Sequence, residues 1–298
     1  MILPFPTPFA PLPNEEVRRV VLAAGTLHLL LHHEDVPLDE LVDFGIRKNP
    51  KRSFLFVSKV LGRHVAARPA ALRDVARRLA QKLPPNLPGP ILVVALAEMA
   101  VALGQFVHLE YANLTGRTDL VSLHSSRHVV GEHVEFTERH SHASRHFLHR
   151  PTRPKERVLI ESAQTVLVVD DEITTGATLL DLVRSLREQN PNLAHVALAS
   201  PICLADPATL EGAIDLPLTL STLVRASLHV ELDPTWQPEP TPNVDTVAHP
   251  HRRAWAEHSA RTGRADPDEV LPALTRMANR LQPRLGERIL VIGTGEFC

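Results

Sequence analysis

The sequence predicts an α/β protein built on a parallel sheet. Three short apolar runs lack polar alternation, which is typical of strands buried on both faces, and they span 91–95, 166–169 and 194–200. Stretches with apolar residues at helical spacing lie before or after these runs, at 69–83, 99–107 and 179–186. Strands that alternate with helices over short turns form parallel sheets, so these observations together indicate the fold class.

Smaller elements come before the first of these buried strands. Residues 1–26 are predicted to form an N-terminal arm that begins with a proline-rich stretch, and an apolar strand follows at 26–33. A short acidic helix is expected at 38–44, and a second apolar strand begins at Ser53. Prolines after Leu83 then end the helix that precedes the first buried strand.

The second half of the chain supplies the remaining elements. We expect a short helix that begins near Asp206, and strands at 119–123, 157–160, 216–224 and 228–232. A proline-rich composition marks a linker. Beyond the linker, helical segments precede a final strand and a glycine turn, and since no helix follows that turn we expect a partial second α/β module. The expected divisions of the chain are 1–26, 27–232, 233–250 and 251–298.

Composition excludes several classes of protein. The formal net charge of -2 gives no support for a basic nucleic-acid binder. Cys203 and Cys298 lie far apart without metal-ligand spacing, which fits a reducing cytoplasm better than an exported, disulfide-bonded protein. The start of the chain lacks the features of a signal peptide. The apolar stretch at 91–109 contains Glu98, Gln105 and His108, so we expect no membrane span.

The segment from Val166 to Thr178 carries the clearest chemical signal. Two carboxylates, Asp170 and Asp171, follow its buried strand, and a turn into a helix then contains Thr174, Thr175, Gly176, Ala177 and Thr178. Backbone N–H groups, hydroxyls and the positive end of a helix suit a phosphate monoester. The carboxylates would repel a bare phosphate, so the ligand must also carry vicinal hydroxyls or a bridging Mg²⁺, as a ribose 5-phosphate can. The alternative is an acidic turn and a capping threonine that merely begin a helix.

Positive charge gathers earlier in the chain. Residues 47–52 include four cations, and Lys59, Arg63 and His64 continue the charge past an apolar strand. A charge run of this kind is often a solvated loop. Its continuation favours a ligand that bears a pyrophosphate.

A second loop is expected to face Asp170. Ala95, Leu96, Ala97 and Glu98 stand where a buried strand ends, and ligands collect at such strand ends in open α/β sheets. The alternative is a plain helix start, with Glu98 placed favourably near the N-terminus of the helix.

The stretch 124–154 is rich in histidine and lacks clean periodicity, so we expect a long loop that closes over the site. His142 and His146 stand four residues apart and would share one face of a helix, as zinc ligands do, but no third ligand accompanies them. Polar or general acid–base histidines in a lid, solvated histidines and a metal site are therefore the three alternatives.

The series from Val166 to Thr178 resembles the signature of type I phosphoribosyltransferases: four hydrophobic residues, two acids and a Thr/Gly-rich loop. The resemblance implies the Rossmann-like parallel sheet of that fold with an N-terminal hood, and Mg²⁺-dependent transfer of a phosphoribosyl group from 5-phosphoribosyl 1-diphosphate (PRPP) to a nitrogen base. It also implies a homodimer. By resemblance, Asp170 and Asp171 bind the sugar hydroxyls or the metal, residues 174–178 bind the 5-phosphate and residues 95–98 bind pyrophosphate. Further catalytic or binding candidates are Lys59, Arg63, Arg127, His140 and His142.

Three stretches together, 49–62, 95–98 and 138–143, resemble a narrower family: the orotate-phosphoribosyltransferase-like proteins of bacterial tellurite-resistance and stress gene clusters. The resemblance implies synthesis of a nucleoside-like metabolite and a following TRSP module. Residues 287–297 resemble an early strand of that module, but its Thr-Arg-Ser-Pro segment is absent, so we expect a truncated one. The competing function is a regulatory module that binds PRPP or a nucleotide without catalysis.

Overall fold

The protein is described by a computed structural model. The structure describes residues 17–47, 54–127, 129, 132–137, 145–151 and 153–237, and two isolated positions, Thr275 and Asn279. Most of the expected linker and the expected C-terminal module at 251–298 lie outside the described residues. Among the described residues, no helix is long and apolar enough to cross a membrane.

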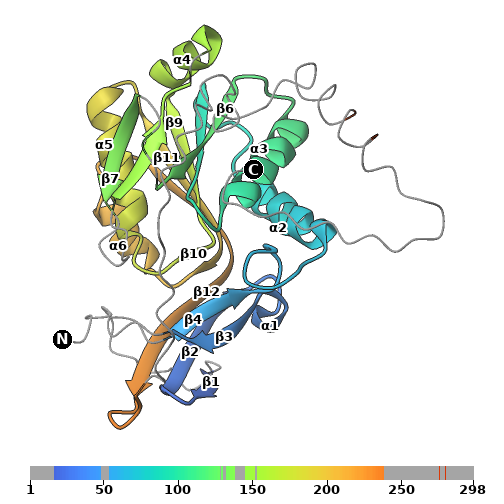
Figure 1. Ribbon diagram of the computed structural model, residues 1–298. Coiled ribbons are helices and arrows are strands. Elements are labelled where there is room, and N and C mark those ends of the chain that lie inside the picture. Colours follow the sequence, from blue (N-terminus) through green and yellow to red (C-terminus); the bar gives the residue numbers. More distant parts are fainter. Residues whose placement is uncertain are drawn as a thin grey trace.

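Five parallel strands form the centre of one large sheet (Figure 1). In spatial order they are β12 (Leu218–Leu232), β11 (His195–Cys203), β9 (Thr165–Val169), β5 (Ile91–Ala95) and β6 (Leu120–Ser126). Antiparallel strands extend both edges: β2 (Gly25–Glu34) and β1 (Val17–Leu22) continue from β12, and β8 (Arg145–His149) and β7 (His133–Thr137) continue from β6. The short β10 (Glu172–Ile173) pairs with β11. The parallel centre confirms the predicted fold class.

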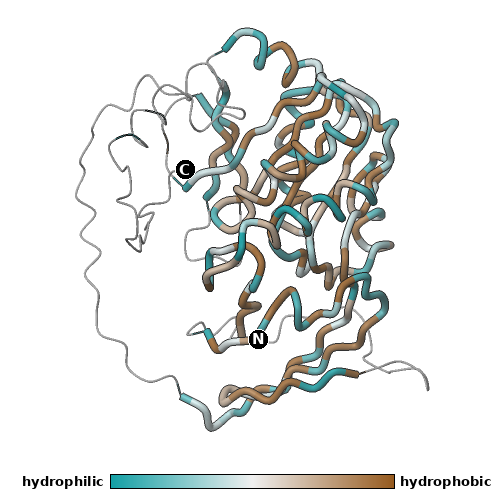
Figure 2. The backbone as a smooth tube through the Cα atoms, turned by 90° about the vertical axis from the view of Figure 1, so that its right-hand side faces the viewer, coloured by the Kyte–Doolittle hydropathy of each residue, from teal (hydrophilic) through white to brown (hydrophobic). Residues whose placement is uncertain are grey.

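Helices cover both faces of this sheet (Figure 1). They are α2 (Pro69–Lys82) and α3 (Val101–Thr115) on one face, and α5 (Ala177–Gln189), α4 (Pro154–Glu161) and α6 (Pro207–Gly212) on the other. Side chains alternate between the two faces of a strand, so Ile91 and Val93 pack with α2 and α3 while Leu92 and Val94 pack with α5. Both sets are buried, which explains why β5 is apolar throughout. Figure 2 shows hydrophobic segments running through the interior of this sheet and its helices.

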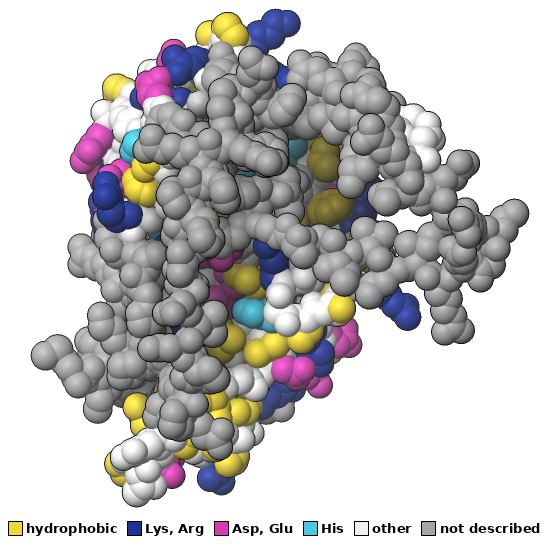
Figure 3. Space-filling model, viewed as in Figure 1, with side chains coloured by type: hydrophobic (Ala, Val, Ile, Leu, Met, Phe, Trp, Pro, Cys, Tyr) yellow, Lys and Arg dark blue, Asp and Glu magenta, His cyan; other side chains and the backbone are white. Residues whose placement is uncertain are grey.

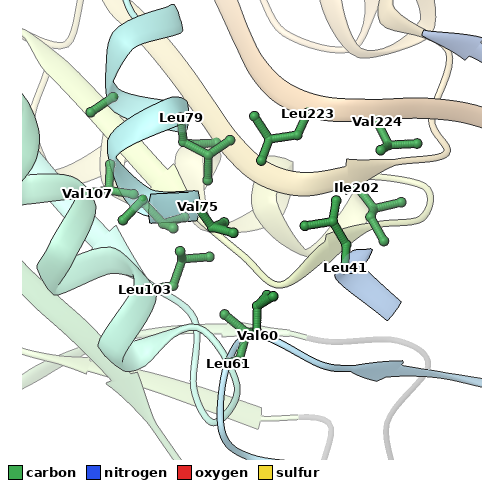
Figure 4. Close-up of a cluster of buried hydrophobic side chains, with 14 of the residues drawn as sticks. Leu41, Val60, Leu61, Val75, Leu79, Leu103, Val107, Ile202, Leu223 and Val224 are labelled. Carbon is green, nitrogen blue, oxygen red and sulfur yellow. The ribbon is translucent and has the colours of Figure 1, made fainter. Parts of the chain in front are cut away.

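A smaller unit, which we call the hood, lies beside the carboxyl ends of the parallel strands (Figure 1). It comprises β1, β2, α1 (Leu38–Leu41), β3 (Val42–Ile46), β4 (Phe54–Ser58) and the end of β12, which leaves β11 and continues along β2. Apolar contacts join the hood to the large sheet and its helices, since Leu41, Val60 and Leu61 share a buried cluster with Ile202 and Val224 (Figure 4). The N-terminal hood implied by the resemblance is therefore present.

Several predicted elements differ from the structure. The helix expected at 38–44 ends at Leu41, because Val42 begins a strand that pairs with β4. Residues 157–160 are helical, as part of α4, although their apolar run predicted a strand. The strands expected at 216–224 and 228–232 form the single strand β12, which changes register between Arg225 and Ala226. Residues 17–26 of the predicted arm belong to the hairpin of β1 and β2.

The histidine-rich stretch at 124–154 contains regular structure, contrary to prediction. Its described residues include the end of β6, the antiparallel pair β7 and β8, and the start of α4. His146 lies in the strand β8, so the helical spacing assumed for His142 and His146 is wrong. His142 itself lies outside the described residues. The β7–β8 pair extends the sheet beyond β6.

Candidate active site

The carboxyl ends of β5 and β9 bring two predicted segments together. Ala95 and Val169, the last residues of these strands, are direct partners in the parallel ladder. The two chain segments stay side by side beyond the strands, because the Leu96 N–H donates to the Val169 carbonyl over 3.0 Å. The loop Ala95–Glu98, which we call the 95–98 loop, therefore starts beside the two acids that follow β9. This is the juxtaposition that the sequence indicated.

The two acids, Asp170 and Asp171, form what we call the acidic pair. Both are half-buried. The Asp170 N–H donates to the Ala199 carbonyl of β11 over 3.0 Å, and the Asp171 N–H donates to Asp170 Oδ1 over 2.9 Å. Burial, together with the adjacent carboxylate of Asp171, raises the pKa of Asp170 well above its ordinary value. A cation or a pair of hydroxyl donors at this point would lower the cost of the negative charge.

The segment Thr174–Thr178, which we call the phosphate turn, leads into α5. Gly176 occupies the N-cap position with φ of 73°, a left-handed conformation that glycine adopts without strain. A side chain there would also clash with Leu210 of α6. The predicted turn into a helix N-terminus is confirmed, and the glycine is required by its backbone conformation.

Some backbone donors of the phosphate turn are not used by the helix. The first helical hydrogen bond runs from the Leu180 N–H to the Gly176 carbonyl over 3.0 Å, and the Ala177 N–H lies 3.4 Å from Thr175 Oγ1. Within the part of the chain that the structure describes, the N–H groups of Gly176 and Thr178 have no hydrogen-bond partner. Helix N-termini with unsatisfied N–H groups attract anions, so this turn can bind a phosphate.

The 95–98 loop is anchored to the sheet and to α3. Its first two residues are buried and Glu98 is exposed. Helix α3 lies close against the end of β5 because Gly104 faces Ala95, and a side chain at Gly104 would overlap Ala95. The peptide between Ala97 and Glu98 is cis.

Hydrogen bonds leave two amides of this region open. The Ala97 N–H donates to Ser125 Oγ over 2.8 Å, and the Ala100 N–H donates to the Leu96 carbonyl over 3.0 Å. Among the described residues, no group accepts from the N–H of Glu98 or of Met99. These two amides are therefore the donors that the region can offer to an anion. The prediction named 95–98, and it missed Met99 because an apolar residue gives no signal for a backbone contact.

The cations predicted from the sequence lie in or beside the hood. The Lys59 ammonium donates to the Asp39 carbonyl over 2.7 Å and lies 3.6 Å from Asp43 Oδ1. Arg63 is exposed. The structure brings neither side chain into contact with the acidic pair. The following residue Val60 shares a buried cluster with Leu103 of α3, which places the Lys59 backbone on the same side of the molecule as the 95–98 loop (Figure 4).

The remaining predicted site residues are only partly described. Arg127 is half-buried and follows β6 directly. His140 and His142 lie outside the described residues. Among the described histidines near the 95–98 loop, His124 is the ladder partner of Ala95, and the Nδ1 of His146 lies 3.3 Å from Ser125 Oγ. Ser125 could not be singled out from the sequence, because a serine within an apolar strand is common.

The acidic pair fits a Mg²⁺ ion that is shared with a ligand. In the described part of the chain, no group of three or more His, Cys, Asp or Glu side chains could hold a metal alone. Mg²⁺ characteristically binds one or two protein carboxylates and completes its coordination with substrate oxygens and water. Asp170 and Asp171 match that donor set. Figure 3 shows acidic, basic and histidine side chains close together near the middle of the face viewed in Figure 1.

A small cavity lies elsewhere, between β6, the β7–β8 pair, α4 and α5. Its volume is about 60 Å³, and its polar side chains include Arg150, Glu161 and Gln189. Arg150 already contacts the other two, at 4.0 Å from Glu161 and 2.6 Å from Gln189. Ligand pockets are several times larger, so this space does not compete with the acidic pair as a substrate site.

Comparison with solved structures finds distant similarity to adenine phosphoribosyltransferases. The enzyme from Rhodothermus marinus has 16% identity and a TM-score of 0.40, with 62% of this chain and 95% of that chain covered. The Giardia lamblia enzyme complexed with 9-deazaadenine has 16% identity and a TM-score of 0.43, with 64% and 97% covered. The Leishmania tarentolae enzyme has 10% identity and a TM-score of 0.44, with 70% and 94% covered. No curated protein matches the chain.

The family model described as "Phosphoribosyl transferase" matches residues 41–227, which are more than half of the 298 residues. The matched region contains the 95–98 loop, the acidic pair and the phosphate turn. The chain therefore belongs to the phosphoribosyl transferase family.

Proposed function

We propose that this phosphoribosyltransferase transfers the 5-phosphoribosyl group from PRPP to a nitrogen base and releases pyrophosphate. The observation that carries the proposal is that the acidic pair follows β9 beside the start of the 95–98 loop and precedes the phosphate turn in the chain. Both segments contain N–H groups that have no partner among the described residues. PRPP carries a phosphate monoester, a ribose diol and a pyrophosphate. Each of these groups has a chemically suitable partner at this edge of the sheet.

Asp170 and Asp171 bind the 2- and 3-hydroxyls of the ribose in this proposal, either directly or through a bound Mg²⁺. Cleavage of the C1–O bond develops positive charge on the ribose ring, so a firmly held sugar and nearby carboxylates lower the barrier. The raised pKa of Asp170 reflects a carboxylate whose charge is poorly stabilised in the free protein. Hydrogen bonds from the diol, or a cation, compensate that charge when the substrate is bound.

The phosphate turn binds the 5-phosphate through the N–H groups of Gly176 and Thr178 and the threonine hydroxyls. The N–H groups of Glu98 and Met99 bind the leaving pyrophosphate. Its charge is offset by Arg63, or by Lys59 once the Lys59 ammonium has left Asp39 and Asp43. Bound Mg²⁺ would neutralise charge on the pyrophosphate, with Asp170 and Asp171 as its protein ligands. Arg127, His140 and His142 stay candidates for the closing of the site and for proton transfer.

The hood is the proposed source of base recognition, because it lies beside the strand ends where the sugar would bind. From the sequence resemblance we further propose a nucleoside-like product linked to tellurite or stress response, and a homodimer. The spacing of the two cysteines is the basis for proposing a cytoplasmic location. The region 251–298 is proposed to be a partial TRSP-like module.

The proposal is tested by incubating the purified chain with PRPP, Mg²⁺ and a panel of nitrogen bases and measuring pyrophosphate. We expect base-dependent release. Saturable PRPP binding without release for every base would favour a regulatory module, and free ribose 5-phosphate would indicate hydrolysis instead.

The acidic pair is tested by Asp171→Asn. We expect calorimetric affinity for Mg²⁺ and PRPP to fall at least tenfold, a loss of about 1.4 kcal/mol or more, with little change in melting temperature. Asp74→Asn removes a carboxylate of α2 that pairs with Arg77 and Arg78, and it serves as the matched control. Unchanged affinity in Asp171→Asn would remove the assignment.

A further inference from the structure

We propose that Ser125 and His146 are positioning residues that hold the 95–98 loop in its anion-binding conformation. Through them the β7–β8 pair is coupled to the loop. The inference rests on the proposed function, because it assigns the two residues to the pyrophosphate half of that site.

Ser125 ties the loop to β6. Its side chain is fully buried, and its Oγ accepts from the Ala97 N–H over 2.8 Å. The preceding amide, that of Leu96, is bound to β9 at the Val169 carbonyl. The N–H groups of Leu96 and Ala97 are thus hydrogen-bonded to β9 and β6, the two strands that flank β5. These bonds fix the backbone just before the open amides of Glu98 and Met99. Loss of either bond would free the peptide planes that direct those amides.

His146 sets the orientation of the Ser125 hydroxyl. It is 2% exposed, and its Nδ1 lies 3.3 Å from Ser125 Oγ. Because that oxygen accepts from Ala97, its own proton can be donated to Nδ1 in the ring tautomer that leaves this nitrogen without a proton. The ring stacks on Phe136 of β7, with centroids 4.9 Å apart and planes at 22°, so its orientation is set by packing.

The contact also connects separate parts of the sheet. Strand β8 pairs with the end of β6 through Ser125 and Leu148 and through Ser126 and Phe147. A displacement of β8 would carry His146 away from the hydroxyl that holds Ala97. Binding of pyrophosphate and the position of the β7–β8 pair should therefore depend on each other.

A purely structural role is the competing explanation, and the chain contains a matched control for it. Ser221 on β12 is also fully buried, and its hydroxyl donates to the Leu79 carbonyl over 2.8 Å. Ser221→Ala removes a buried serine hydrogen bond of the same kind, on a strand segment that is not part of the proposed site. The two alanine variants should lose stability alike but differ in ligand binding.

The experiment measures affinities for Mg²⁺-pyrophosphate and for ribose 5-phosphate separately by calorimetry. We expect Ser125→Ala, and His146→Phe, which keeps an aromatic ring beside Phe136, to weaken pyrophosphate binding about tenfold, since a buried amide loses its fixed acceptor. Affinity for ribose 5-phosphate should change less than twofold. Ser125→Thr, which keeps the hydroxyl, should restore pyrophosphate binding. Ser221→Ala should change neither affinity.

Hydrogen exchange of the amides at 96–100 provides a second measurement that requires no ligand. Exchange there should be faster in His146→Phe than in the wild type and unchanged in Ser221→Ala. Unchanged pyrophosphate affinity and unchanged exchange in the Ser125 and His146 variants would overturn the inference while leaving the proposed function intact. A wild-type chain that binds neither ligand would refute the proposed function, and the inference with it.

Discussion

Asp170→Asn should make the free protein more stable while it removes substrate binding. The ionised carboxylate is half-buried beside Asp171, and both conditions raise its pKa in the folded chain. The folded state therefore holds the proton more tightly than the unfolded state, and stability falls as pH rises from the ordinary value of 3.8 through the raised pKa. Asparagine carries no charge and keeps an oxygen that can accept from the Asp171 N–H.

Each tenfold difference between the acid dissociation constants of Asp170 in the folded and unfolded states corresponds to about 1.4 kcal/mol of unfolding free energy. We expect a gain in unfolding free energy on the order of 1 kcal/mol at pH 8, which raises the melting temperature by roughly 2–4 °C for a domain of this size. The difference between variant and wild type should shrink as the pH approaches 4.

Thermal melts from pH 4 to pH 8, without PRPP or metal, measure this effect. Asp74→Asn is the control with opposite sign, because Arg78 and Arg77 hold the pKa of Asp74 below its ordinary value. Its melting temperature should be equal to or lower than that of the wild type at pH 8. An Asp170→Asn variant that melts at or below the wild-type temperature at pH 8 would refute the electrostatic reasoning.

Three further predictions concern single side chains. Gly176→Ala and Gly116→Ala both place alanine at positive φ, which costs about 1–3 kcal/mol, so both variants should have a lower melting temperature than the wild type. Only Gly176→Ala should weaken the binding of ribose 5-phosphate. Equal losses of affinity in the two variants would contradict the assignment of the phosphate turn. Burial raises the pKa of Cys203 to about 11, so iodoacetamide at pH 8 should label this thiol far more slowly in the folded chain than in the unfolded chain. Peptide mass mapping measures the two rates, and equal rates would contradict the burial of Cys203. Asp206 caps α6 by accepting from the Thr209 N–H, so Asp206→Ala should lower the unfolding free energy by about 1 kcal/mol in denaturant melts. Asp206→Asn keeps an acceptor oxygen and should lower the unfolding free energy much less. Equal losses in the two variants would argue against the cap.

The sheet centre could be predicted from the sequence because its strands are buried on both faces. Such strands need continuous apolar residues, and β5 matches its predicted bounds of 91–95. The phosphate turn could be predicted because a glycine and several small hydroxyl residues follow the two carboxylates in the sequence, and glycine is the residue that adopts positive φ without strain, as Gly176 does.

Antiparallel edges were harder to predict because their pattern is shared with loops and helices. Strands β7 and β8 are short and contain several histidines, and nothing in their local sequence shows that they pair with each other. Residues 157–160 are apolar enough for a strand, yet Pro154 begins a helix there, as prolines at first helical positions do. Pairing and chain direction are tertiary properties, so local patterns did not determine them.

The site shows the same division. Asp170 and Asp171 could be proposed from the sequence because carboxylates directly follow a buried strand. The open N–H groups of Glu98 and Met99 and the role of the buried Ser125 hydroxyl depend on hydrogen bonds between residues that are far apart in the sequence. Lys59 was predicted from its charge, and the structure shows that charge bound to Asp43 of the hood.

A crystal structure with PRPP and Mg²⁺ bound tests the central claim most directly. The account predicts the 5-phosphate on the N–H groups of Gly176 and Thr178, and the ribose 2- and 3-hydroxyls on Asp170 and Asp171, directly or through the metal. A phosphate bound away from residues 174–178, or a ribose whose hydroxyls contact neither carboxylate nor a metal held by them, would contradict it.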